Sequence, residues 1–377
     1  MGSHLIKRNF RPVEIYYCMC FFYIIFHCGL LFILYSRDGK ENNVSNIVAA
    51  SVTNISVNEL PFCVNRLLNR QDYHYDEWAK GLNDNFQLIS KIKLESCRLL
   101  YYTTKPIVSC LDQIYQERIT ENKFFYANGT KPPTELQFVF MGDSRIRQQY
   151  FNFIKELPDY DKETQPDPMS LKWKYDMEFT SELLRLRVSF LSRPLLNESV
   201  IDTLRHWAVS TQSERPFLIL LSIAVHHMLQ ENGGDFRLYQ KKLIQLAPLL
   251  GQLSKVSNII WLNQYPTVDQ YDDSTNNGLG HNTDIHSEKI HAYNKAIRHI
   301  LKSEKSVSIW DSSNPLVEEY VRSCAVYPLR EAVKGTFSLQ YIACEDYIHS
   351  GNAALSQATQ LLINDICNKK LYKENNE

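Results

Sequence analysis

Short apolar runs alternate with helical patterns from Glu135 to Cys367, and this alternation constrains the fold more than any other feature of the sequence. Such alternation is typical of a parallel sheet that is covered by helices on both faces. The expected strands are Leu136–Met141, Leu186–Leu191, Phe217–Ala224, Asn258–Asn263 and Ser306–Trp310. The expected helices are Arg145–Leu157, Glu198–Ser210, Phe236–Lys255, Ser287–Lys302 and Gly351–Cys367. We therefore predict an α/β fold with three α/β/α layers and a mostly parallel sheet of these five strands.

The first expected strand ends at Gly142-Asp143, and a helical pattern begins at Ser144. A serine at such a turn exposes its hydroxyl at the carboxyl end of the sheet, near a helix N-terminus that favours developing negative charge. Asp and Ser are also the usual residues that cap a helix, so this turn alone does not identify a nucleophile. A base elsewhere in the chain is needed to support that interpretation.

The segment Asp346-Tyr347-Ile348-His349 offers such a base near the other end of the chain. One loop of this kind can hold both a histidine and the carboxylate that orients it. His349 would take the proton from Ser144, and Asp346 would fix the tautomer of the imidazole and stabilise its cation. The amphipathic helix that follows would hold this loop on the sheet.

These motifs resemble those of the animal Golgi N-acetylneuraminate (sialic acid) O-acetyltransferase family, in the PC-esterase branch of the SGNH/GDSL hydrolases. The resemblance covers roughly Cys63 to Lys370 and rests on Gly142–Gln148, Arg187–Leu191, Ala247–Leu250, Trp261–Pro266, Ala292–Asn294 and Cys367–Lys369. It implies an SGNH-like fold and acetyl transfer from acetyl-CoA, with no bound cofactor, to a hydroxyl of CMP-sialic acid or a sialoglycan. An acetylated Ser144 would be the intermediate. A lumenal carbohydrate O-acetylesterase and an inactive glycan-binding relative are the alternatives.

The resemblance also implies groups that would stabilise an oxyanion. The family has a glycine N–H after the third strand, where this chain has Ser222. A serine N–H can donate equally well if the backbone geometry there is accessible without glycine. Asn263 and Gln264 follow the fourth strand and point to opposite faces, so at most one amide can be a further donor. Position matching favours Gln264, although an amide that satisfies loop backbone is an equally open interpretation.

Arg145 and Arg147 follow the nucleophile but do not share a face of the helix. One could bind a carboxylate or phosphate of the substrate while the other pairs structurally, and the resemblance favours Arg147 for the substrate. His226 and His227 are interpreted as loop or cleft histidines rather than a second base.

Residues Ile15–Tyr35 contain no Asp, Glu, Lys or Arg. A helix of this length crosses a hydrocarbon core of about 30 Å. Lys7, Arg8 and Arg11 precede it, which orients the N-terminus to the cytoplasm. We favour an uncleaved signal-anchor over a cleaved signal peptide, whose apolar core is typically about 7–15 residues. With the family resemblance, this predicts a single-pass type II Golgi membrane protein with a lumenal catalytic domain.

The expected organisation is a cytoplasmic tail (1–14), a membrane anchor (15–35), a stem (36–60), a cysteine-containing extension (61–134), the catalytic domain (135–370) and a polar tail (371–377). A net charge of −1 gives no electrostatic case for nucleic acid. No cysteine or histidine spacing suggests a metal site. The family's full-length enzyme continues into a multi-span membrane region that this sequence does not include. A separate membrane protein that delivers acetyl-CoA is therefore an open expectation.

Six cysteines follow the span, namely Cys63, Cys97, Cys110, Cys324, Cys344 and Cys367. An even number agrees with three disulfides in an oxidising lumen, although counting leaves their connectivity open. The resemblance implies Cys97–Cys110, because the related enzyme has the same spacing before its Gly-Asp-Ser. Sequons at Asn43, Asn54, Asn128 and Asn197 agree with the same compartment.

Overall fold

The computed structural model describes residues 60–63, 67–69, 73–75, 97–121, 134–167, 175–268, 284–314, 317, 321, 324–330, 337–342, 344 and 348–368. All of them belong to the compact unit Ile55–Glu377. The predicted membrane span 15–35, the sequons at Asn43, Asn54 and Asn128, and the predicted triad member Asp346 lie outside these residues. Among the helices of these ranges, none has the length and apolar character that a membrane crossing needs.

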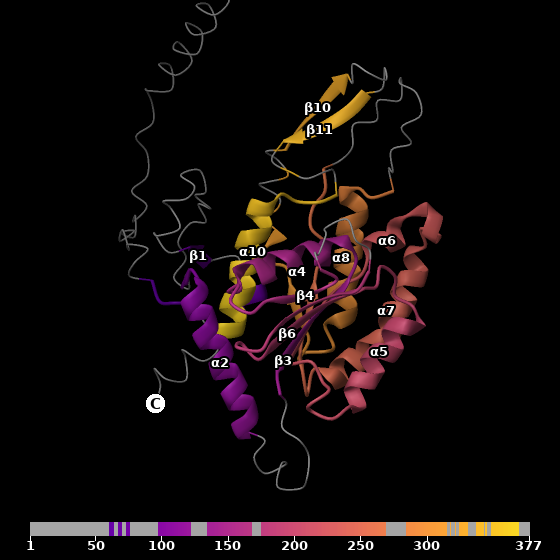
Figure 1. The fold of residues 1–377 in the computed structure, drawn as a ribbon. Helices are drawn as coiled ribbons and strands as arrows, with labels where there is room; N and C mark the ends of the chain where they lie inside the picture. Colours follow the sequence, from indigo (N-terminus) through magenta and orange to yellow (C-terminus); the bar gives the residue numbers. More distant parts are fainter. Residues whose placement is uncertain are drawn as a thin grey trace, which may run out of the picture. The chain divides into compact units, whose positions relative to one another are not determined.

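Within the described ranges, one mixed sheet has the strand order β4-β5-β6-β3-β7-β8-β9. Strands β4, β6 and β3 of this sheet are labelled in Figure 1. Its parallel strands are β6 (Leu186–Ser192), β3 (Leu136–Gly142), β7 (Leu218–Ser222), β8 (Asn258–Leu262) and β9 (Ser308–Trp310), close to their predicted bounds. Beyond β6, β5 (Met177–Ser181) pairs antiparallel with β6, and β4 (Glu163–Gln165) pairs antiparallel with β5. The prediction of a five-stranded sheet is therefore wrong, because these short and partly polar strands lack the apolar runs of the buried ones.

Helices cover both faces of this sheet because its central strands are apolar on both sides. Phe138 and Phe140 of β3 pack in one cluster with α2 (Thr104–Glu121), α4 (Ser144–Glu156) and α10 (Asn352–Cys367). Val139 and Met141 pack in a second cluster with α5 (Glu198–Val209), α7 (Phe236–Leu253) and α8 (Ser287–Leu301). All five predicted helices are present, whereas α2 was not predicted.

Shorter elements complete the described chain. They are η2 (Leu67–Asn69), the parallel pair β1 (Tyr73–Tyr75) and β2 (Cys97–Leu99), α6 (Val225–Met228), η4 (Gln230–Asn232), and an antiparallel hairpin of β10 (Ala325–Arg330) and β11 (Phe337–Ile342). The disulfide Cys324–Cys344 closes the base of this hairpin, a few residues before His349.

The cysteine-containing extension is held on α10 by three side-chain amides spaced four residues apart. Gln360 bonds both the N–H and the C=O of Tyr102, at 2.8 and 2.9 Å. Asn364 does the same for Leu100, at 2.9 and 2.7 Å. Asn368 donates to the Cys63 carbonyl at 2.8 Å. These amides satisfy backbone groups as a neighbouring strand would, so the extension shares the core of the catalytic region.

Three disulfides join described cysteines, as the even count predicts: Cys63–Cys97, Cys110–Cys367 and Cys324–Cys344. The implied Cys97–Cys110 pair is wrong. Hydrogen bonds from Cys63 N to Arg98 O and from Arg98 N to Pro61 O set Cys63 beside Cys97, with Cα atoms 4.9 Å apart. Cys110 lies on α2, which packs against α10 and its Cys367. Packing between distant segments therefore decided the pairing.

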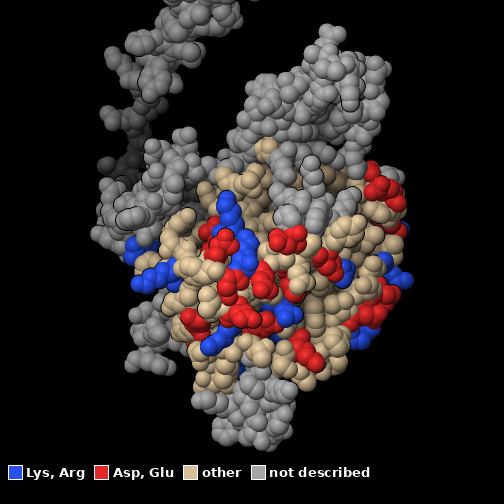
Figure 2. Space-filling view, viewed as in Figure 1, with Lys and Arg blue, Asp and Glu red and all other residues tan. Residues whose placement is uncertain are grey.

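Acidic and basic side chains are interspersed on the described surface of the face in Figure 2. Around β5 and β6, Arg187 lies 2.8 Å from Glu135, and Arg193 lies 2.7 Å from Asp176. Ion pairs of such exposure contribute about 0–1 kcal/mol each, so the apolar clusters stabilise the fold far more. Asn197, whose sequon is described, is exposed, and its Oδ1 caps α5 by accepting from Val200 N at 3.2 Å.

Candidate active site

The turn between β3 and α4 requires glycine at position 142. Gly142 has a φ of +152°, and a Cβ there would lie 1.9 Å from the Ser222 carbonyl oxygen. Asp143 follows as the N-cap of α4, with its Oδ1 accepting from Arg145 N at 3.0 Å and its N–H donating to Ser222 O at 3.2 Å. The turn thus lies in contact with the end of β7, and α4 begins at Ser144.

The structure brings Ser144 and His349 into contact. His349 Nε2 lies 2.7 Å from Ser144 Oγ, although 205 positions separate the two residues. Both side chains are half-buried, at the carboxyl end of β3 where α4 begins. This distance is that of a hydrogen bond through which an imidazole can take the serine proton.

Ser222 and Gln264 lie together beneath this turn, and both are buried. Gln264 Nε2 donates to Ser222 Oγ at 3.0 Å. Asn263 points elsewhere, because its Nδ2 donates to Asp311, which also pairs with Arg298. Of the two neighbouring amides, Gln264 is therefore the one beside Ser222, and Asn263 has a structural contact.

Asn294 of α8 fixes the backbone of Gln264, a role that the sequence did not reveal. Its Oδ1 accepts from Gln264 N and its Nδ2 donates to Gln264 O, each at 2.8 Å. The only sequence indication was that Ala292–Asn294 belongs to a segment resembling the family.

Arg145 and Arg147 differ in burial, as their spacing on a helix allows. Arg145 is 1% exposed, and its guanidinium donates to the carbonyls of Tyr265 and Ile348. Arg147 is half-buried.

His227 is a buried structural acceptor. Its Nε2 accepts from Leu196 N at 2.8 Å, and burial, with smaller effects from Lys242 and His226, lowers the pKa of His227 to about 4. The ring is therefore neutral at neutral pH and links the segment after β6 to the one after β7.

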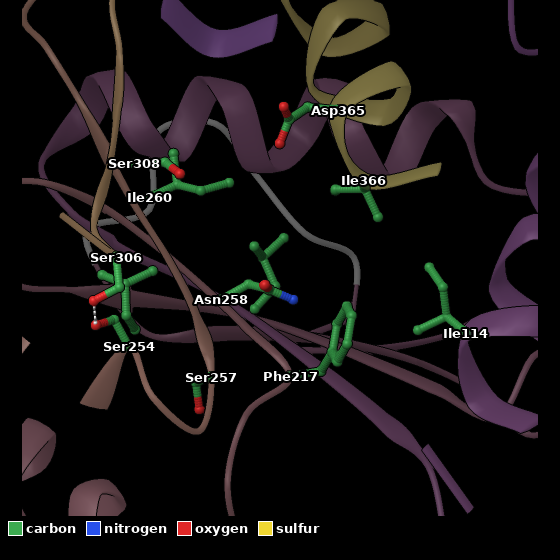
Figure 3. Close-up of a pocket in the computed structure, with 12 residues that line it drawn as sticks. Ile114, Phe217, Ser254, Ser257, Asn258, Ile260, Ser306, Ser308, Asp365 and Ile366 are labelled. Carbon is green, nitrogen blue, oxygen red and sulfur yellow. Dashed lines mark hydrogen bonds between the residues drawn. The ribbon is translucent and has the colours of Figure 1, made fainter. Parts of the chain in front are cut away.

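A cavity of about 200 Å³ lies at the amino-terminal ends of the parallel strands, opposite the ends where Ser144 lies (Figure 3). It is bordered by the first residues of β7, β8 and β9, with Ile114 of α2 and Ile366 of α10. No histidine is among its described lining residues. Ligands of open α/β sheets bind at the carboxyl ends of strands, so the Ser144–His349 contact marks the better candidate site.

No protein-family model matches the chain. Among curated proteins, the chain is 27% identical over 240 residues to the N-acetylneuraminate (7)9-O-acetyltransferase of Danio rerio. The chain therefore resembles a sialic acid O-acetyltransferase, as its motifs predict. The match covers 63% of this chain but spans about a quarter, 26%, of the length of that relative. Among solved structures, a peptidoglycan O-acetylesterase aligns with a TM-score of 0.36 and 9% identity, over 69% of this chain and 94% of that one.

Proposed function

We propose that the chain is an O-acetyltransferase that moves acetyl from acetyl-CoA to a hydroxyl of sialic acid, with Ser144 as nucleophile and His349 as base. The observation that carries this proposal is the 2.7 Å contact between Ser144 Oγ and His349 Nε2 at the start of α4. Similarity to a protein named N-acetylneuraminate (7)9-O-acetyltransferase supports the choice of donor group and acceptor. The proposal includes a Golgi location with residues 15–35 as the membrane anchor.

The reaction would proceed through an acetyl-enzyme. Ser144 Oγ attacks the thioester carbonyl while His349 takes its proton, and the C–S bond breaks as CoA leaves with that proton. A sialic acid hydroxyl then gives its proton to His349 and attacks the acetyl carbon. Ser144 leaves, recovers the proton, and the acetylated sugar is released. Asp346, outside the described residues, would orient the imidazole in both steps.

The proposed oxyanion donors are the Ser222 N–H and the Gln264 amide. A primary amide has two N–H donors, so Gln264 can hold Ser222 Oγ with one and face the oxyanion with the other. Arg147 is proposed to bind the carboxylate of sialic acid or the phosphate of CMP-sialic acid. A water molecule in place of the sugar hydroxyl would give an acetylesterase instead.

The test incubates the full chain with acetyl-CoA and CMP-sialic acid and, separately, with an O-acetylated sialoside. We expect acetyl transfer that Ser144→Ala and His349→Ala abolish and that Ser308→Ala preserves, because the half-buried Ser308 lies at the amino-terminal ends of the parallel strands. Deacetylation without transfer would favour the esterase alternative. Undiminished activity of Ser144→Ala would refute both.

A further inference from the structure

Arg145 connects three separate segments around the proposed nucleophile. It directly follows Ser144 in α4, its Nη1 donates to the carbonyl of Tyr265 after β8, and its Nη2 donates to the carbonyl of Ile348 at 2.9 Å. Ile348 immediately precedes His349. One guanidinium therefore joins the helix that carries the nucleophile to the loop that carries the base.

Tyr265, one of the two residues whose carbonyls Arg145 contacts, is also held through its side chain. Gln149 lies four residues after Arg145, on the same face of α4. Its Nε2 donates to the Tyr265 hydroxyl, and its Oε1 accepts from Thr359 of α10 at 3.1 Å. Tyr265 is thus held at its backbone by Arg145 and at its hydroxyl by Gln149, so the carbonyl that Arg145 contacts belongs to a residue that is fixed at two points.

A buried cation at this position is costly, and the two carbonyls offset part of that cost. At 1% exposure its charge is removed from water, and it lies in the first turn of α4, where the helix dipole disfavours a cation. Lysine could not replace it equally, because one ammonium lacks the planar pair of N–H groups that reaches two carbonyls of different loops.

We propose that Arg145 is a positioning residue that sets the distance between Ser144 Oγ and His349 Nε2 by holding the Ile348 carbonyl against α4. It acts on the base through the backbone, since Ile348 immediately precedes His349. The inference rests on the proposed function. Misplacement of a reacting group by an ångström can lower the rate about 100-fold, so we expect a loss of that order in kcat for Arg145→Met. The KM for acetyl-CoA should change by less than about 3-fold, because the substrate-binding groups remain.

Arg118 provides a matched control. It is also a buried arginine that donates to two backbone carbonyls, those of Gln212 and Arg215, each at 2.8 Å. These carbonyls precede the amino-terminal end of β7, whereas Ser144 lies at the carboxyl end of β3. Arg118→Met should therefore lower the melting temperature about as much as Arg145→Met and leave kcat unchanged.

The experiment measures acetyl transfer from acetyl-CoA and the melting temperature for the wild-type full chain, Arg145→Met, Arg145→Lys, Arg118→Met and Ser144→Ala. If Arg145→Met does not fold, Arg145→Lys must show the loss in kcat at unchanged KM. Wild-type kcat in the folded Arg145 variants, or an equal loss in Arg118→Met, would overturn the positioning role. Full activity of Ser144→Ala would instead refute the proposed function itself.

Discussion

Replacing Asn294 by alanine would remove two hydrogen bonds from the buried backbone of Gln264. Asn294 is 6% exposed and Gln264 is 0% exposed, so bulk water does not reach these bonds in the folded protein. The Gln264 N–H would lose its partner, whereas its carbonyl would keep a longer contact with Asn314 Nδ2 at 3.4 Å. An orphaned buried N–H costs about 1–3 kcal/mol, and a lost net hydrogen bond about 1 kcal/mol. We therefore expect Asn294→Ala to lower the free energy of unfolding by about 3 kcal/mol, or the melting temperature by roughly 6–12 °C.

The same substitution should also reduce catalysis, because the proposed donor Gln264 would lose its anchor. Loss of one oxyanion donor typically lowers kcat about 100- to 1000-fold, so a displaced donor should cost at least about 10-fold. Asn364→Ala is the matched control, since Asn364 forms the same two bonds with the backbone of Leu100 and is also fully buried. It should be destabilised at least as much while its kcat stays at the wild-type value.

Thermal unfolding followed by circular dichroism gives the stability of both variants, and kcat is measured at a temperature where both are folded. A wild-type kcat in a destabilised Asn294→Ala would show that the position of Gln264 does not matter for the reaction. A similar fall of kcat in Asn364→Ala would show that general loosening, rather than the site, explains the effect.

Two further predictions concern the turn after β3 and the buried histidine. Gly142→Ala should lower the free energy of unfolding in urea by at least about 3 kcal/mol, because the added Cβ would lie 1.9 Å from a backbone oxygen. Gly233→Ala is the control, since Gly233 has a φ of +92° but no atom within 4 Å of an added Cβ, and it should cost only about 1 kcal/mol. Equal losses in the two variants would contradict the clash. The pKa of His227 is about 6.5 in the unfolded chain and about 4 in the fold. The stability that the neutral ring contributes is therefore complete above pH 6.5, and up to about 3 kcal/mol of it is lost as the pH falls toward 4. The unfolding free energy of the wild type should therefore fall more steeply between pH 7 and 4.5 than that of His227→Gln, and parallel profiles would refute this.

The buried strands and amphipathic helices of the catalytic region could be predicted because their periodicity records burial directly. In β3, for example, Phe138–Met141 is an uninterrupted apolar run that is buried on both faces. β5 alternates over only five residues, and α2 has a weakly amphipathic sequence, so neither stood out. Cys97–Cys110 failed for a different reason. It rested on the spacing of two cysteines in a related sequence, whereas α10 brings Cys367 across the fold to Cys110.

The candidate site was predictable only at the positions where chemistry requires a particular residue type. Ser144 and His349 could be chosen because a serine at a strand-to-helix turn and a histidine in the segment Asp346–His349 fit a nucleophile and its base. The polar contacts around them could not, because Arg145 and Asn294 bind backbone carbonyls or amides of loops far away in the chain. A backbone group carries no sequence label, so a side chain that binds one leaves no pattern at the partner position. The side chains that hold the backbone around this site are therefore those that only a folded structure can reveal.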